Sequence, residues 1–325
     1  MKTKILEALK KSDEYISGQE LCEKCGVSRT AIWKAVNQLR SDGYEIESVT
    51  GRGYRLVSER DILSKEEIAS ELGGNDIVNE IYYYDEIDST NNKAKKLGEE
   101  GTLDGTLVVA DYQSAGKGRR GRSFDSPAGQ SIYMTLLLRP EIVPEKASML
   151  TIVAAMAVKK GIEEVCGITS GIKWPNDIVA ENKKVCGILT EMSAEPDMVN
   201  YVAIGIGINV NNENVPEELK NMAVSVKMIT GNTYKRSRII AAVMKHFKLY
   251  YEKFLSTQDL SVIKDEYNSE LIHMGKTIEV IKGSDKYEAK SMGIDDDGEL
   301  LIERDGKPEK VISGEVSVRG VFGYV

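Results

Sequence analysis

The first sixty residues carry the hydrophobic spacing of short helices. Ile5, Leu6 and Leu9 fall on one face of a first amphipathic helix, and Gly18–Lys24 is predicted as a second helix that ends at a tight turn. Ser28 follows that turn and belongs to the residue types that cap helix N-termini, so a third helix is expected to begin there.

The third helix has two distinct faces. Ile32, Val36 and Leu39 recur at i, i+4 and i+7 and can face a core, which leaves polar side chains on the outward side of the first turns. Helix-turn-helix proteins present such side chains to base edges and phosphates. The candidate DNA-contacting residues of this helix are Ser28, Arg29, Thr30, Trp33 and Lys34.

A two-stranded ribbon is predicted after Gly43, where the third helix ends. Tyr44–Val49 and Tyr54–Val57 alternate polar and apolar residues, and the connecting Thr50–Gly53 places Arg52 at its tip, as in a basic wing. This order of elements predicts a winged helix-turn-helix domain that binds DNA, with Arg52 among its contacts. A small helical protein-interaction module is the alternative.

Beyond a short polar hinge, strand and helix signals alternate along the chain, which predicts an α+β body. Helices are expected from Ser64 to Gly73, at Asn92–Gly98, and from Pro144 through Glu164. The expected strands are Ile81–Tyr84, Thr106–Ala110, Ser131–Leu138, Gly171–Val179, Lys184–Glu191 and Val202–Asn209. Gly171–Val179 and Lys184–Glu191 are expected to pair as a hairpin.

The segment that begins near Gly275 alternates as short strands. Asp297-Gly298 and Asp305-Gly306 are dipeptides of the kind that close tight hairpins. A small β-barrel is therefore predicted. Its strands are expected at Lys276–Ile281, Lys286–Ile294, Leu300–Arg304 and Val311–Arg319. The three expected domains are residues 1–60, 64–272 and 273–325.

The composition is that of a globular protein with an acidic body. Of the 325 residues 41% are hydrophobic and 29% charged, and no apolar run approaches the roughly 20 residues that span a bilayer. We therefore expect a cytoplasmic protein with no membrane partner. Residues 1–60 hold 11 Lys and Arg against 9 Asp and Glu, whereas the whole chain holds 43 against 51, so the remainder has 32 against 42. A basic head on an acidic body hints that the head alone meets a polyanion.

Cysteine and histidine are too few for a soft-ligand metal centre. Cys22 and Cys25 form a C-x-x-C pair, but no second Cys or His pair lies at zinc-like spacing. No protein-built metal site is predicted. Any metal should be a hard cation such as Mg²⁺, held by carboxylates and substrate phosphates.

The most informative motif is Gly116–Arg122, with three glycines and four cations between two predicted strands. A dinucleotide fingerprint or a P-loop would have to open a helix, and a turn-forming cluster follows here instead. Backbone N–H groups and guanidinium forks in such a loop suit a bound phosphoester. A flexible, solvated basic loop is the alternative from these residues alone.

Other polar groups are expected near this loop. Asp88–Asn92 contains more polar side chains than the cap of the following helix requires. The predicted hairpin brings Lys184 close to Asn176 and Asp177. Glycines inside the apolar strand Val202–Asn209 indicate close approach by a ligand or by a packed helix, and these two readings stay open.

Together these segments resemble the bacterial biotin–protein ligases that also repress the biotin operon, and the order and spacing of the motifs fit over nearly the whole chain. The motifs that carry the resemblance are Asp88–Asn91, Gln113–Arg122, Lys173–Asp177, Lys184–Leu189 and Gly205–Asn209. The resemblance implies a mixed-sheet ligase domain like that of class II synthetases, followed by an SH3-like barrel. It also implies biotin, ATP and Mg²⁺ as substrates and cofactors, with biotinyl-5'-AMP as intermediate and co-repressor. The implied partners are a biotin carboxyl carrier domain, operator DNA and a second copy of the chain, in a homodimer that biotinyl-5'-AMP promotes.

The resemblance also implies residue roles. The implied catalytic residues are Lys184, Arg119 and Asp177. The implied biotin-binding residues are Ser89, Thr90, Asn91, Gln113, Lys117, Gly118, Arg119 and Lys184. The implied ATP or adenylate-binding residues are Arg119, Arg122, Phe124, Asn176 and Asn209.

Two positions depart from the family pattern. Lys117 stands where an arginine is usual, which keeps the charge but loses a bidentate fork, and Phe124 stands where an indole is common. We expect altered affinity and an unaltered reaction. Two other functions remain as alternatives, a lipoyl-type ligase of the related fold and a regulator that senses biotin without catalysis.

Overall fold

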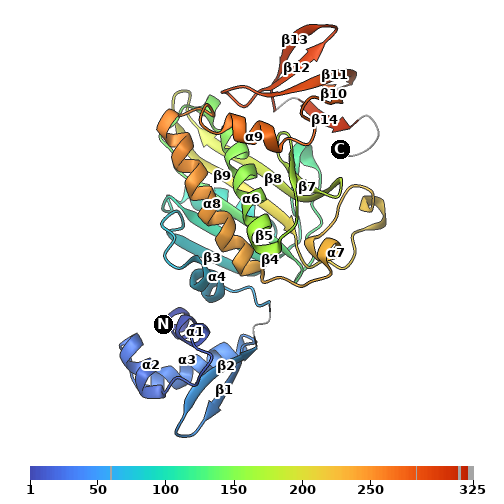
Figure 1. Cartoon of the computed structure of the whole chain (residues 1–325). Coiled ribbons are helices and arrows are strands. Elements are labelled where there is room, and N and C mark those ends of the chain that lie inside the picture. Colours follow the sequence, from blue (N-terminus) through green and yellow to red (C-terminus); the bar gives the residue numbers. More distant parts are fainter. Residues whose placement is uncertain (59–60, 283, 314–315, 321–325) are drawn as a thin grey trace. The chain divides into compact units, whose positions relative to one another are not determined.

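The computed structural model describes residues 1–58, 61–282, 284–313 and 316–320, and it divides into two compact units. Unit 1 comprises Met1–Gly74 with Lys235–Ala241, and unit 2 comprises Asn75–Tyr234 with Ala242–Val325 (Figure 1). In the described part of the chain, no helix combines the length and the apolar character needed to cross a membrane.

Unit 1 contains the predicted helix-turn-helix and its ribbon. Its elements are α1 (Lys2–Lys10), α2 (Gly18–Cys25), α3 (Arg29–Ser41), β1 (Glu45–Val49), β2 (Gly53–Ser58) and α4 (Lys65–Leu72). The hydroxyls of Ser17 and Ser28 accept the backbone N–H groups of Glu20 and Ala31, so each caps its helix as the residue type suggests. Apolar side chains from the helices and from β1 form one core, which includes Ile5, Leu6, Leu9, Leu21, Ile32, Val36, Leu39 and Ile46.

The wing is fixed to the helices by a close backbone approach. Ile16 and Tyr54 form an isolated antiparallel bridge, with the two N–H···O bonds at 2.8 and 2.9 Å. Gly53 lies beside this bridge at φ +113°, and a Cβ there would overlap the Ile16 carbonyl. Only glycine satisfies both conditions. The predicted order of helix, turn, helix and wing is confirmed.

Unit 2 is built on a seven-stranded mixed sheet of order β3-β4-β5-β9-β8-β7-β6. The β3–β4 pair is parallel and the other neighbouring pairs are antiparallel. The strands are β3 (Glu80–Ile87), β4 (Thr106–Gln113), β5 (Ser131–Leu138), β6 (Gly171–Lys173), β7 (Asp177–Ala180), β8 (Lys183–Ala194) and β9 (Val199–Asn209). The α+β prediction is confirmed.

Helices cover both faces of this sheet. On one face α5 (Thr90–Glu99) packs Ala94 and Leu97 against β4, β5 and β9. On the other face α6 (Met149–Cys166) meets β8, where the Thr151 and Thr190 hydroxyls bond at 2.8 Å. Figure 1 shows α8 (Arg236–Thr257) running beside α6. The remaining helices and single turns are Arg119–Gly121, Pro144–Lys146, Glu217–Leu219, α7 (Val226–Thr230) and α9 (Lys264–Glu270).

Two predicted elements of this unit were wrong in extent. Pro144 opens a single 3₁₀ turn, in which the hydrogen bonds run i→i+3. The long α-helix begins only at Met149. The strand expected at Gly171–Val179 is interrupted at Trp174 and Pro175, which join β6 to β7 through a cis peptide bond. A proline has no N–H to donate to a ladder, so the strand divides there.

The C-terminal part of unit 2 is a five-stranded antiparallel sheet of order β13-β12-β11-β10-β14. Its strands are β10 (Thr277–Lys282), β11 (Asp285–Ile294), β12 (Leu300–Arg304), β13 (Lys307–Val311) and β14 (Val316–Gly320). Both predicted hairpin turns are present. The single strand expected at Val311–Arg319 is wrong, because Val311 ends β13, which pairs with β12, whereas β14 pairs with β10.

Candidate functional site

The floor of a pocket in unit 2 is made of glycines. They are Gly187 of β8 with Gly205 and Gly207 of β9. A Cβ at Gly187 would lie 2.6 Å from Lys184 Nζ. One at Gly205 would overlap the Asn91 carboxamide, and one at Gly207 would lie 2.8 Å from the Phe124 ring. Successive odd positions of a strand share a face, so the glycines open a shallow bed onto which three functional side chains fold.

Asn91 is held rigidly at the neutral end of this pocket. Its Nδ2 donates to the Leu189 carbonyl at 3.2 Å and to Glu191 at 2.9 Å, while its Oδ1 accepts from the Thr135 hydroxyl at 2.7 Å. Lys95 pairs with Glu191 at 2.6 Å. Burial opposes ionisation of Glu191, but the bonds from Lys95 and Asn91 outweigh it and lower the pKa of that carboxyl. The carboxamide orientation is therefore set from both ends.

Thr90 and Gln113 complete the neutral end. The Gln113 Oε1 accepts the Thr90 backbone N–H at 2.8 Å, and its Nε2 donates to Ser126 at 3.1 Å. The Thr90 hydroxyl lies 2.9 Å from Thr135 and 3.1 Å from Gln113. Ser89 is 2% exposed at the N-cap position of α5 and also lines the pocket. These hydroxyl and amide groups can recognise a small polar ring without carrying charge.

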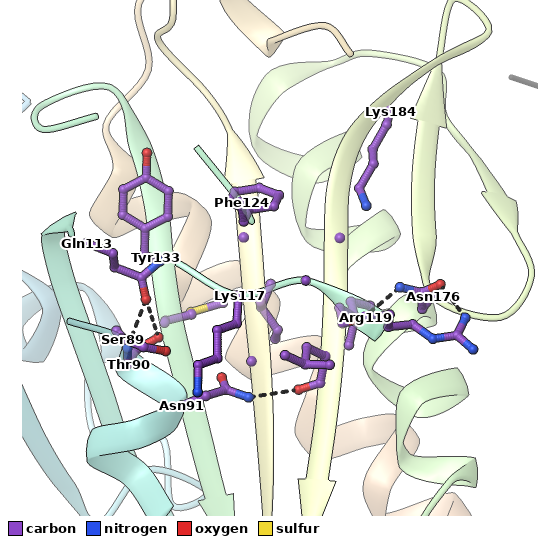
Figure 2. A pocket seen from close by; sticks show the side chains of 18 residues that line it. Ser89, Thr90, Asn91, Gln113, Lys117, Arg119, Phe124, Tyr133, Asn176 and Lys184 are labelled. Atoms are coloured by element: carbon purple, nitrogen blue, oxygen red, sulfur yellow. Dashed lines mark hydrogen bonds between the residues drawn. The ribbon is translucent and has the colours of Figure 1, made fainter. Parts of the chain in front are cut away.

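Two cations lie at the other end of the pocket. Arg119 donates to Asn176 Oδ1 at 3.0 Å (Figure 2). It also donates to the Ser313 carbonyl. Lys184 Nζ pairs with Asp177 Oδ1 at 2.6 Å. Burial lowers the pKa of Arg119 below its usual value, an effect that the charge of Asp177 partly offsets. The predicted hairpin thus brings Lys184 to Asp177, with Val179 of β7 opposite Lys184 of β8.

The glycine-rich loop lies over the pocket. Lys117 and Gly118 line it, and Lys117 Nζ reaches Asn92 Oδ1 at 2.8 Å. Phe124 lies on the glycine floor and meets the Tyr133 ring edge to face, with centroids 6.3 Å apart. In Figure 2 the side chain of Lys117 runs across the pocket toward Asn91. The remaining cavity is only about 50 Å³, so a ligand larger than a few waters requires Lys117 and Phe124 to move aside.

Three residues expected at the site lie outside this lining. Asp177 meets it only through its ion pair with Lys184, at 2.6 Å. Arg122 is exposed, and its carbonyl accepts the N–H of Gly118 at 2.7 Å. Asn209 ends β9, where its Nδ2 donates to the Val224 carbonyl at 3.3 Å. Asn176 and Phe124, from the same expected set, do line the pocket.

A metal cage is not preformed in the described residues. They contain no group of three or more His, Cys, Asp or Glu side chains arranged to hold an ion. The carboxylates nearest the pocket, Asp177 and Glu191, are each already paired with a lysine.

The candidate DNA-binding residues share the open surface of unit 1. All five side chains on α3 are exposed, and Trp33 is 56% exposed. A groove between the start of α3 and the wing is lined by Arg29 and Arg52 among others. The Arg52 guanidinium lies 4.5 Å from the centroid of the Tyr15 ring, and Arg29 donates to Gln19 at 3.2 Å. This surface presents cations and an indole without burying them.

Comparison with known proteins matches three segments of the chain. Residues 83–209 match the Biotin/lipoate A/B protein ligase family, residues 2–55 match an HTH domain, and residues 273–319 match the Biotin protein ligase C terminal domain. The bifunctional ligase/repressor BirA of Bacillus subtilis is 40% identical over 308 residues, which cover 94% of each chain. The BirA of Escherichia coli is 30% identical and covers 97% of this chain and 96% of its own length.

The chain belongs to the bifunctional biotin ligase/repressor family. A solved biotin protein ligase from Aquifex aeolicus, in complex with biotin and ATP, aligns with a TM-score of 0.65 and 31% identity over 74% of this chain and 99% of its own. The resemblance drawn from the five sequence motifs is confirmed.

Sequence reasoning missed several side chains of this ligase pocket. Tyr133 and Met134 line it from β5, and Thr135 orients Asn91 from the same strand. Glu191 fixes Asn91 from β8. The three β5 residues lie in a largely apolar strand, where the hydroxyl of Thr135 between Met134 and Leu136 was a weak signal.

Proposed function

We propose that this ligase joins biotin to ATP as biotinyl-5'-AMP and then transfers the biotinyl group to a lysine of a biotin carboxyl carrier domain. The observation that carries the proposal is the polarity of the pocket, with Arg119 and Lys184 at one end and hydroxyl and amide groups at the other, toward which Lys117 reaches across the pocket. A ureido ring needs neutral donors and acceptors, whereas a carboxylate that meets a phosphate needs cations. The Aquifex ligase, which binds biotin and ATP in its solved complex, supports this pair of ligands.

In the first step an oxygen of the biotin carboxylate attacks the α-phosphorus of ATP and pyrophosphate leaves. Negative charge accumulates on the phosphoryl oxygens, where the fixed cations Arg119 and Lys184 stabilise it. Asp177 orients Lys184 through the 2.6 Å ion pair, and Asn176 orients Arg119. These cations are therefore aimed before the substrates arrive.

We assign the remaining contacts by chemistry. The neutral groups of Ser89, Thr90, Asn91 and Gln113 hold the ureido ring, and Lys117 and Gly118 close over the acyl chain. The adenylate side is assigned to Arg122, Phe124, Asn176 and Asn209, of which the Phe124 ring can stack on adenine. Mg²⁺ arrives with the ATP phosphates, because the part of the chain that the structure describes holds no preformed carboxylate cage for it.

The second step is the attack of a lysine ε-amine on the acyl carbon of the adenylate, which releases AMP. The amine mainly needs positioning and loss of its proton, because the phosphoanhydride is already activated. The winged helix binds operator DNA through the exposed α3 residues and Arg52, and biotinyl-5'-AMP promotes the dimer that represses. We place both activities in the cytoplasm, where carrier and operator are found.

One experiment separates this function from the alternatives. The pure chain is mixed with MgATP and either biotin or lipoate, and pyrophosphate release is followed. Pyrophosphate release is expected with biotin and not with lipoate. Release with lipoate in place of biotin would favour a lipoyl-type ligase, and no release with either would leave a biotin sensor without catalysis.

A further inference from the structure

Both residues that pair with the pocket's cations follow Trp174 closely, Asn176 in the connection between β6 and β7 and Asp177 as the first residue of β7. Asn176 accepts from Arg119 at 3.0 Å, and Asp177 pairs with Lys184 at 2.6 Å. They follow Trp174 by two and three positions in the chain. The backbone of Trp174 is therefore one constraint on where these partners lie, together with the two hydrogen bonds that join Asn176 to β8.

The C-terminal segment fixes Trp174 at two points. The backbone N–H of Trp174 donates to His273 Nε2 at 3.2 Å, and the Trp174 indole N–H donates to the Gly298 carbonyl at 3.0 Å. Just before these contacts, one residue before His273 and two before Trp174, the Ile272 N–H donates to the Ile172 carbonyl at 3.0 Å. Trp174 is 1% exposed, so water cannot replace these partners.

The imidazole of His273 is set up as an acceptor toward Trp174. Because a backbone N–H faces Nε2, the proton must reside on Nδ1, which lies 2.8 Å from the Ser291 hydroxyl. Burial, followed by the charges of Lys173 and Lys276, lowers the pKa of His273 to about 4. The ring is therefore neutral at physiological pH, as the contact requires.

We propose that His273 is a positioning residue for biotin adenylation, and that it acts through the backbone of Trp174 on the loop that aims Arg119 and Lys184. The inference rests on the proposed function. It assigns to the start of the C-terminal segment a positioning role in the first chemical step. The residues at the neutral end of the pocket come from α5, β4 and β5, so this linkage bears on catalysis rather than on recognition of the ureido ring.

The two nitrogens of the ring allow a matched pair of substitutions. In His273→Gln the carboxamide reaches the Nε2 position and can still accept the Trp174 N–H. In His273→Asn the shorter carboxamide reaches the Nδ1 position and keeps a partner for Ser291 alone. A residue that merely secures the C-terminal sheet would depend on the Ser291 contact, and would tolerate Asn better than Gln.

Adenylate formation is measured for both full-length variants at saturating ATP and varied biotin. His273→Asn should lower kcat by about tenfold, less than the roughly 100-fold loss that a 1 Å misplacement can cause, and leave the biotin KM within about twofold. His273→Gln should stay within about threefold of the parent rate. His246→Asn is the control. It alters a histidine of α8 that pairs with Glu164 of α6, and it should change neither constant.

Iodide quenching supplies the spectroscopic readout, because the chain has two tryptophans. Trp33 is 56% exposed and Trp174 1% exposed, so the quencher-resistant emission reports Trp174. This fraction should fall in His273→Asn and persist in His273→Gln. Equal kcat losses in the two variants, or an Asn variant as fast as the parent, would overturn the inference. Absence of adenylate from the unaltered chain would instead remove the proposed function, and this inference with it.

Discussion

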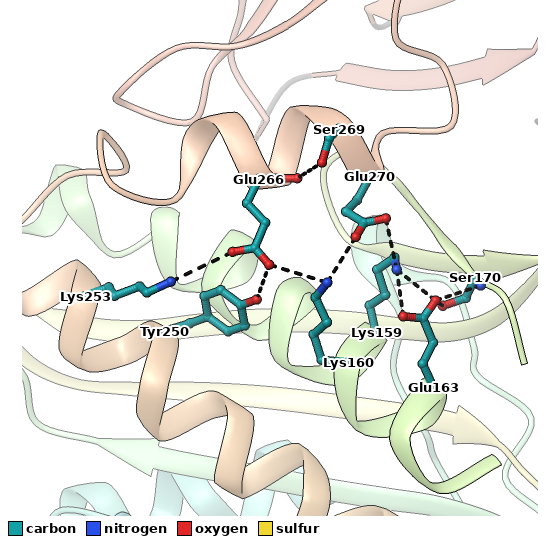
Figure 3. Close-up of polar contacts among 9 residues, drawn as sticks. All are labelled: Lys159, Lys160, Glu163, Ser170, Tyr250, Lys253, Glu266, Ser269 and Glu270. Carbon is teal, nitrogen blue, oxygen red and sulfur yellow. Dashed lines mark hydrogen bonds and ion pairs between the residues drawn. The ribbon is translucent and has the colours of Figure 1, made fainter. Parts of the chain in front are cut away.

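Two lysines in unit 2 show how differently a polar cluster can be completed. Lys159 of α6 has a side chain 4% exposed, and its ammonium meets Glu163 at 2.8 Å and Glu270 at 3.0 Å (Figure 3). Lys184 has a side chain 26% exposed and borders the pocket. Among the described residues its one ion-pair partner is Asp177.

The cluster around Lys159 is saturated. Both Glu163 oxygens contact the ammonium at 2.8 Å, and one of them also accepts the N–H and hydroxyl of Ser170. Further bonds join α6, α8 and α9. They are made by Lys160, Tyr250, Lys253 and Glu266, while Ser269 donates to the Glu266 carbonyl within α9 (Figure 3).

An ammonium has three donors, and the difference between the clusters lies in how many are used. Lys159 directs its donors to three carboxylate oxygens, so it binds the helices together and has no capacity for a ligand. Lys184 holds one carboxylate and keeps the rest of its capacity for an anion in the pocket. Incomplete pairing distinguishes a site for chemistry from a structural cluster.

The largest effect is expected from Lys184→Met. It should reduce biotin adenylation by about 10³-fold, at the upper end of what one transition-state donor contributes, because charge on the phosphoryl oxygens loses a fixed cation. Pyrophosphate release measures this, and circular dichroism should show an intact fold. Turnover at the parent rate would remove Lys184 from the mechanism.

Lys159→Met is the matched substitution in the saturated cluster. It should lower the free energy of unfolding by about 2–4 kcal/mol, below the usual upper range for breaking a buried pair because both glutamates are 24% exposed and can hydrate. Urea denaturation measures the change. Adenylation per folded molecule should stay at the parent rate, and a loss comparable with that of Lys184→Met would erase the distinction between the two clusters.

The glycine floor allows a sharper comparison inside the pocket. In Gly205→Ala the new Cβ overlaps the Asn91 carboxamide, which is bonded at both ends and cannot yield. The biotin KM should rise by about 10- to 100-fold, equivalent to leaving one buried polar group unpaired. In Gly207→Ala the Cβ meets the Phe124 ring, which can turn away, so the biotin KM should rise less. An equal rise in both would contradict the assignment of Asn91 to the ureido ring.

Arg29→Ala tests the cations of unit 1, which are exposed, whereas Lys159 and Lys184 are largely buried. Operator binding should weaken by about 1–3 kcal/mol, with the salt dependence of the parent reduced, because a contact to DNA is lost. Adenylation and the melting temperature should not change. A gel-shift titration at two salt concentrations with biotin and ATP present measures the effect. Unaltered operator affinity would mean that another surface contacts the DNA.

The smallest expected effect is a pH dependence of stability from Glu270. Burial opposes its ionisation, but hydrogen bonds from Lys159 and Lys160 outweigh it and lower the pKa of Glu270 from 4.5. A depressed folded pKa contributes stability above the unfolded value, and that contribution disappears as the pH falls below 4.5 through the folded pKa. Between pH 6 and 3, Glu270→Gln should therefore lose less stability than the parent in urea titrations. A parallel decline in both proteins would assign the acid sensitivity to other carboxylates.

The sequence carried most of the fold because local signals agreed with the final elements. Ser131–Leu138 has the same bounds in the structure, and Ser28 caps α3 as its residue type suggests. The division at Trp174 has a local signal in Pro175, but the anchoring of the indole has none, since its partner, Gly298, lies 124 positions away. The bond from Asn91 to Glu191 spans 100 positions and has no local signature either. Motifs identified which residues gather, whereas the contacts that orient them are long-range.

Hydrogen exchange with a non-hydrolysable biotinyl-adenylate analogue tests whether the glycine-rich loop and Lys184 close over the ligand. Strong protection of Gly116–Phe124 and of the start of β8 is expected on binding, because the loop must open and then close over the ligand while Lys184 completes its pairing. Protection confined to other segments, or none at saturating analogue, would contradict this closure.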